Sequence, residues 1–119
     1  MWRAILTTMS ISLGACAGTD DPRFDSTDPV HCMAIFGIAA NGAKQASNAA
    51  AADEMFRRAS FLAGQQGGAA WIEKITPRSL EAGKEMEAAQ DERATLKLLD
   101  ECVAKQNADP AFQARMRKR

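Results

Sequence analysis

Apolar and polar positions divide the chain into three stretches that predict different structures. A short apolar run lies between Ala4 and Leu13, a polar stretch follows as far as Asp28, and the remainder shows apolar residues at helical spacing. The first run has about half of the roughly 20 apolar residues that a membrane span needs. With Arg3 ahead of it and small residues after it, the run has the layout of a bacterial export signal. We therefore expect residues 1–17 to be a signal peptide.

Two cleavage sites overlap at the end of this signal, and they differ in whether the exported protein carries lipid. Residues 13–16 read Leu-Gly-Ala-Cys, which resembles a bacterial lipobox, and cleavage before Cys16 would leave that cysteine lipidated and tethered to a membrane. Residues 15–17 form an A-x-A site, at which cleavage before Gly18 would release a protein without lipid. The polar residues 18–27 have little apolar surface to bury and read as a disordered spacer, which favours the tethered form. The folded domain is expected at residues 28–119.

Proline and capping residues mark helix starts in this domain. Asp28-Pro29, Thr76-Pro77 and Asp109-Pro110 each join a capping side chain to a proline. Such a pair suits a helix start, because the side chain accepts a first-turn N–H and the missing N–H of proline costs nothing there. The three pairs predict helices that begin at the three prolines.

The first two helices are predicted from their apolar faces. Residues 29–40 are apolar on almost every side, which indicates a helix at the centre of the fold that ends at Asn41-Gly42. A second, alanine-rich helix is expected from residue 43 or 47 to Ala63, with Gly64 as its stop. Its apolar face comprises Ala52, Met55, Phe56, Ala59, Leu62 and Ala63. Residues 65–68 read as a flexible loop.

The second half of the chain predicts two or three further helices. Residues 69–75 could form a short helix that packs Trp71, Ile72 and Ile75, with Trp71 as a core anchor. A long helix should then run from Pro77 toward Lys105, with a bend or break near Asp91. Its apolar positions step mostly by three and four, through Ala82, Met86, Ala89, Leu96, Leu99 and Val103.

A last short helix is expected from Pro110, docked on the bundle through Phe112 and Met116 at i and i+4.

Cysteine usage adds a covalent link to this fold. Cys16 is either lipidated or removed, so that export leaves Cys32 and Cys102 in an oxidising compartment, where they should pair. The bridge would close a loop of roughly 70 residues, worth about 4 kcal/mol in the chain-entropy model. That is a large share of the roughly 5 to 10 kcal/mol that stabilises a small domain. The predicted fold is therefore an all-α bundle of about four to five helices, stapled by one disulfide.

Charge gives no argument for nucleic acid as a partner. The chain has 15 basic and 15 acidic residues, and loss of Arg3 with the signal leaves the exported part close to neutral. Nucleic-acid binding normally needs a strongly basic face.

Candidate catalytic and metal-binding groups are few. His31 is the only histidine, and Cys32 beside it points about 100° away on a helix, so that the two cannot work as base and nucleophile on one face. No C-x-x-C or H-x-x-x-H spacing suggests zinc, and the glycines between Gly64 and Gly68 lack the Gly-Lys-Ser/Thr ending of a phosphate-binding loop. We expect no catalytic residue, no metal and no cofactor.

The C-terminus is the one clear run of charge, with Arg115, Arg117, Lys118 and Arg119. In an exported protein these side chains could contact anionic lipid head groups, at about 1 kcal/mol for each residue near the surface. The simpler interpretation is a solvated end that complements a helix dipole.

A small exported helical domain with one long-range cysteine pair resembles the periplasmic acid-stress chaperones of the HdeA type. The likeness spans Asp28 to about Phe112. It rests on Cys32 near the start of the first helix, on Thr76-Pro77, and on Cys102 followed by a polar stretch. Thr76-Pro77 lies much further from Cys102 than the matching pair does in that family, so the resemblance implies the disulfide and no residue roles.

Two functional hypotheses follow. The first is a non-catalytic envelope protein, in the periplasm or as an outer-membrane lipoprotein facing it, that binds a protein partner or unfolded chains. The alternative is a small envelope enzyme or a ligand carrier that uses the bundle interior. The first is favoured because enzymes usually show a convergent acid, base or nucleophile.

The intact mass of the exported protein tests the processing and the disulfide together. We expect a chain that starts at Cys16 and carries acyl groups, or one that starts at Gly18 without them, in either case two hydrogens lighter than the dithiol form. Mass spectrometry before and after reduction measures this difference. An unprocessed chain, or no change on reduction, would contradict the export hypothesis.

Overall fold

The computed structural model describes residues 21–117, which contain five helices and no strand. They are α3 (Pro29–Gln45), α4 (Ala49–Gln66), α5 (Ala69–Ala89), α6 (Glu92–Asn107) and α7 (Pro110–Arg117). The predicted all-α bundle is thereby confirmed. The expected signal peptide with both its cleavage sites, Cys16, Lys118 and Arg119 lie outside the described residues.

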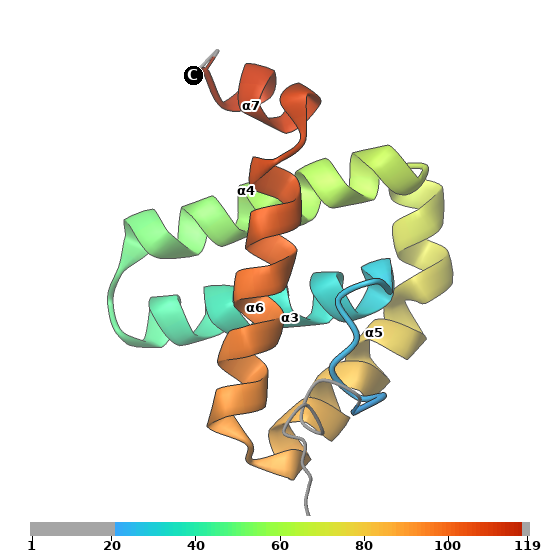
Figure 1. Ribbon diagram of the computed structural model, residues 1–119, viewed down its shortest axis with the longest axis vertical. Coiled ribbons are helices and arrows are strands. Elements are labelled where there is room, and N and C mark those ends of the chain that lie inside the picture. Colours follow the sequence, from blue (N-terminus) through green and yellow to red (C-terminus); the bar gives the residue numbers. More distant parts are fainter. Residues whose placement is uncertain (1–20, 118–119) are drawn as a thin grey trace, which may run out of the picture.

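Helix α3 is the centre of the bundle. Helix α4 returns antiparallel to it, α6 crosses the two, and α5 packs along another side of α3, while α7 follows the end of α6 (Figure 1). The best buried large side chains come from three helices: Ile35 and Phe36 of α3, Met86 of α5, and Leu98 and Cys102 of α6. An almost wholly apolar α3 can occupy this position because other helices cover most of its surface.

Helix α3 begins as the sequence predicts and ends later. Asp28 caps it by accepting the N–H of Val30 at 2.9 Å, with Pro29 in the first turn. The predicted stop at Asn41-Gly42 is wrong, because the helix continues to Gln45 and the Gly42 carbonyl accepts the N–H of Ala46. A glycine inside a helix costs only about 1 kcal/mol relative to alanine, which the surrounding alanines and the packing on α4 outweigh.

Helix α4 also runs past its predicted stop. It begins at Ala49, where Asn48 accepts the N–H of Ala51, and continues through Gly64 to Gln66. The turn is made by Gly67 and Gly68, whose φ angles of 128° and 76° lie in the left-handed region that favours glycine. The first half of the expected loop at residues 65–68 is therefore helical.

The predicted helix start at Thr76-Pro77 is wrong. Pro77 lies inside α5, and the Thr76 hydroxyl donates to the carbonyl of Ile72. Figure 1 shows the axis of α5 turning partway along its length, as proline inside a helix makes it do. Ile75, Ala82 and Met86 are buried on one stripe that spans the proline, so packing against the bundle keeps the helix continuous.

The break expected near Asp91 is present and complete. Gln90 has a left-handed φ of 51°, and Asp91 caps α6 by accepting the N–H of Ala94. The predicted single long helix is therefore two helices. The break also shifts the buried face of α6, so that Leu98 is buried while Leu96, assigned to the apolar stripe, is 52% exposed.

Several apolar side chains are more exposed than predicted. Trp71 is half-buried, so it is no central core anchor, and of the residues expected to pack with it only Ile75 is buried. Ile72 and Phe56 are exposed. Phe61, which the prediction left out of the α4 face, is buried against Phe112 of α7 with ring centroids 5.1 Å apart.

The predicted disulfide between Cys32 and Cys102 is confirmed. The two α-carbons are 5.7 Å apart across a separation of 70 residues. The bond joins the first turns of α3 to the second half of α6, and both cysteines are buried. It therefore holds together two helices that lie at opposite ends of the folded chain.

The residues ahead of α3 extend the folded body. Residues 21–27, expected as part of a disordered spacer, form turns in which Phe24 is buried in the main core cluster. Lys105 of α6 donates to the carbonyl of Ser26 at 2.9 Å. The buried Phe24 ring and the bond from Lys105 attach this segment to the bundle, so the folded domain begins before Asp28. Residues 18–20 lie outside the described part of the chain.

A buried arginine joins α4 to the end of α6. Arg58 donates to the side-chain oxygens of Gln106 and Asn107, both at 3.2 Å, and its carbonyl accepts from the Gln106 amide at 2.8 Å. Its guanidinium also lies 5.0 Å from the centre of the Phe112 ring. These contacts satisfy two buried polar side chains at once.

Replacing Arg58 with alanine should lower the free energy of unfolding by about 2 to 3 kcal/mol, because Gln106 stays buried without its donor. The neighbouring Arg57 supplies the control, since it forms only an exposed ion pair with Asp53. Arg57→Ala should cost less than about 1 kcal/mol. Urea denaturation measures both values, and equal losses would contradict the structural role of Arg58.

Candidate functional site

A groove with largely apolar walls lies on the surface between α3 and α5 and is called here the α3–α5 groove. It has a volume of about 470 Å³ and is lined by Met33, Ala34, Gly37, Ile38 and Asn41 from α3 and by Ser79, Leu80, Gly83, Lys84 and Glu87 from α5. Leu80 is 63% exposed, the most exposed of the large apolar side chains in residues 21–117. The groove therefore presents apolar surface to solvent between two rigid helices.

Missing side chains help to keep the α3–α5 groove open. A β-carbon added at Gly37 would meet nothing within 4 Å, so that this position borders empty space. A β-carbon at Gly83 would lie 3.9 Å from Ile38, at ordinary contact distance. Lys84 and Glu87 give the α5 side one charge of each sign. Such a groove suits an apolar segment with polar flanks.

A second, smaller cleft lies beside the disulfide. It has a volume of about 260 Å³, and Cys32, Cys102 and Leu62 form part of its wall. Lys105 and Asp109 contribute a charge of each sign, but both are already engaged: Lys105 with the Ser26 carbonyl and Asp109 with the Gln65 amide at 2.8 Å. The cleft has few free polar groups with which to orient a ligand.

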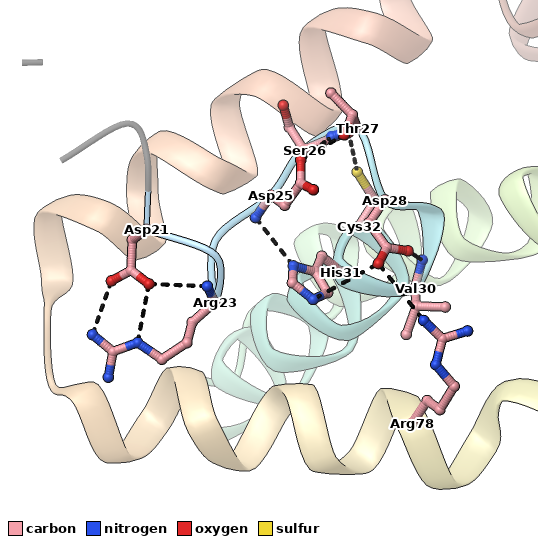
Figure 2. Close-up of polar contacts among 10 residues, drawn as sticks. All are labelled: Asp21, Arg23, Asp25, Ser26, Thr27, Asp28, Val30, His31, Cys32 and Arg78. Carbon is pink, nitrogen blue, oxygen red and sulfur yellow. Dashed lines mark hydrogen bonds and ion pairs between the residues drawn. The ribbon is translucent and has the colours of Figure 1, made fainter. Parts of the chain in front are cut away.

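His31 lies under the segment that precedes α3 (Figure 2). Its Nδ1 accepts the backbone N–H of Asp25 at 3.1 Å, and its Nε2 lies 3.9 Å from Oδ2 of Asp28. Arg78 of α5 approaches the same Asp28 oxygen at 3.8 Å. Cys32 has no thiol to offer, because it is in the disulfide. The geometry gives His31 a contact that ties two segments together.

The acidic and basic side chains are distributed over the surface and do not form a cluster within residues 21–117 that could hold a metal ion. Lys97 and Glu101 pair on the exposed face of α6, and the hydrogen bond from Lys97 is the main cause that lowers the pKa of Glu101. This pair stabilises a solvated helix face.

Only part of the basic C-terminal run is described. Arg115 and Arg117 lie in the last turn of α7 and are exposed, and the Arg115 guanidinium lies 5.9 Å from the centre of the Phe61 ring. Arg115 therefore has a packing contact within the fold. Contact with an anionic surface stays a prediction.

No helix in residues 21–117 is both long enough and apolar enough to cross a membrane. No family model, curated protein or solved structure is similar enough to this chain to count as a match. The resemblance to HdeA-type chaperones stays a prediction.

Two features of these sites could not be read from the apolar pattern. The α3–α5 groove depends on how α5 packs against α3, which the positions of single residues do not predict. The contact of His31 depends on the fold of residues 21–27, which the polar composition did not predict. Arg58 did leave a trace, because it interrupts the apolar face of α4 between Met55 and Leu62.

Proposed function

We propose that this chain is an exported, non-catalytic protein of the bacterial envelope that binds an apolar segment of another protein in the α3–α5 groove. The observation that carries the proposal is the groove itself, with Leu80 exposed at its edge. An isolated exposed leucine is common, but one beside an apolar groove marks a surface that a partner can cover.

The disulfide supports the export part of this proposal. Stable disulfides persist in oxidising compartments and are rare in the cytosol. Cys32 and Cys102 are joined and buried, as a structural bridge requires. The apolar run ahead of Gly14 supports the same destination.

A tether through Cys16 would make the protein an outer-membrane lipoprotein facing the periplasm. Cleavage before Gly18 would make it a periplasmic protein. In both forms the groove stays available, because it is built from α3 and α5 alone. The binding proposal is thus independent of the lipid.

The proposed activity is chaperone-like, and Leu80→Glu should weaken it. Added to citrate synthase diluted from guanidinium, the wild-type protein should suppress aggregation measured by light scattering. Loss of one apolar anchor should raise the concentration needed by about five- to tenfold. Leu96→Glu is the matched control, because Leu96 is also exposed but lies on α6 outside the groove.

A second variant blocks the groove without a clash. Gly37→Gln adds a side chain where there is open space and removes a helix glycine, so the fold should be kept while suppression falls. No suppression by the wild type would exclude the chaperone-like activity. If Leu80→Glu and Leu96→Glu weakened the suppression of aggregation equally, the α3–α5 groove would not be the binding site.

The alternative, a carrier of small ligands, would use the cleft beside the disulfide. Its volume of about 260 Å³ lies just below the usual range for ligand pockets, and Leu62 and the disulfide give it an apolar wall.

A ligand carrier would be stabilised by its ligand. A ligand present at a hundred times its dissociation constant should raise the free energy of unfolding by about 2.7 kcal/mol. A thermal-shift screen of metals, lipids and sugars measures this stabilisation as a higher melting temperature. No stabilisation by any of them would count against the carrier.

A further inference from the structure

Residues 21–27, called here the strap, lie across the side of the bundle where α3 and α6 are joined. The backbone carbonyl of Ser26 lies 3.5 Å from the sulfur of Cys32 and accepts a hydrogen bond from Lys105. Phe24 inserts into the core. The strap also forms part of the wall of the cleft beside the disulfide, through Ser26 and Thr27. Its position therefore determines how open that side of the bundle is.

One hydrogen bond from the strap depends on a titratable side chain. The N–H of Asp25 donates to Nδ1 of His31, which must present a lone pair to accept it. The neutral ring then carries its proton on Nε2, toward Asp28. A protonated ring has an N–H at both nitrogens and cannot accept. This bond exists only with neutral His31.

Charged groups from several elements surround His31. Those that face it are Asp25 on the strap, Asp28 at the helix cap, and Arg78, Glu81 and Glu85 on α5. Glu101 and Lys105 of α6 face the strap. The carboxylates of Asp28, Glu81 and Glu85 stay beside an imidazolium whether or not the strap is in contact, so they do not replace the lost bond.

Asp25 is the one carboxylate that could hold the strap to a charged His31. Its oxygen Oδ1 already accepts two hydrogen bonds from Thr27, at 2.9 Å from the backbone N–H and at 2.6 Å from the hydroxyl. These bonds are the main cause that lowers the pKa of Asp25, so it stays ionised through mild acid. The carboxylate is thereby held within the strap, and its attraction for His31 acts through partly exposed, screened surroundings.

We propose that His31 is a pH-sensitive latch for the strap. With the ring neutral, Asp25 is bonded and the strap is closed over the disulfide side of the bundle. An imidazole ordinarily takes up its proton between about pH 5 and 8. Protonation of His31 removes the Asp25 bond and increases opening of the strap, which exposes Phe24 and widens the cleft. His31 is the only histidine, so the latch depends on the protonation of a single imidazole.

Amide hydrogen exchange of the strap tests the latch. NMR on the isotope-labelled, disulfide-intact protein as isolated from its producing cells gives protection factors corrected for intrinsic exchange at each pH. Between pH 7.5 and 5.0 the protection of the Asp25 amide should fall about three- to tenfold, as expected for one hydrogen bond lost. The Ala51 amide, bonded to the uncharged Asn48 side chain, is the internal control and should not change.

The titration of the ring gives a second readout in the same samples. The ¹⁵N shifts of His31 should show an unprotonated Nδ1 at pH 7.5, and its protonation should follow the same pH curve as the loss of Asp25 protection. His31→Asn keeps an acceptor near the Nδ1 position and cannot be protonated in this range, so its Asp25 protection should be independent of pH. Three results would each overturn the latch. They are an Asp25 protection factor that does not change with pH in the wild type, an Nδ1 that is protonated at pH 7.5, and an Asp25 protection factor that changes with pH in His31→Asn as it does in the wild type.

Discussion

The bond between Cys32 and Cys102 is the constraint on which the arrangement of helices depends. It joins the start of α3, the central helix, to α6, which crosses α3 after the chain has passed through two further helices. Aromatic side chains are few, and many helix contacts are made through alanine, which buries little apolar area. A covalent link that restricts the unfolded chain contributes where such a core is modest. The disulfide thereby holds α6 against α3 and gives the strap a fixed surface to lie on.

Two regions near the disulfide are held by different kinds of contact. Buried hydrogen bonds between Arg58 and Gln106 join α4 to α6, and the Arg58 guanidinium also lies over the Phe112 ring of α7. The strap is held by the buried Phe24, by the hydrogen bond from Lys105 and by the hydrogen bond to His31. These contacts are fewer than those that hold the helices together. The α3–α5 groove shares no lining residue with either of these regions. The proposed binding function would use this groove.

The sequence predicted that the fold is helical, that helices start at Pro29 and Pro110, and that Cys32 pairs with Cys102. Each of these follows from the helical spacing of apolar residues, from local capping or from simple thiol chemistry. The helix ends could not be predicted in this way. Gly42 and Gly64 lie within helices, since neighbouring alanines and tertiary packing outweigh the small cost of one glycine. Thr76-Pro77 has the pattern of a helix start, yet the buried stripe from Ile75 to Met86 carries α5 through it. The groove and the strap depend on contacts between segments distant in the sequence, and for that reason the pattern of single positions did not predict them.

Comparison of the free energy of unfolding with the disulfide intact and after its removal tests the central claim most directly. Urea denaturation of the oxidised wild type and of a Cys32→Ser, Cys102→Ser double variant supplies the two values under identical conditions. The account predicts a loss of about 2 to 4 kcal/mol in the variant, in line with the large loop that the bridge closes. Equal stability of the two proteins would contradict it, because the covalent link between α3 and α6 would then contribute nothing to the fold.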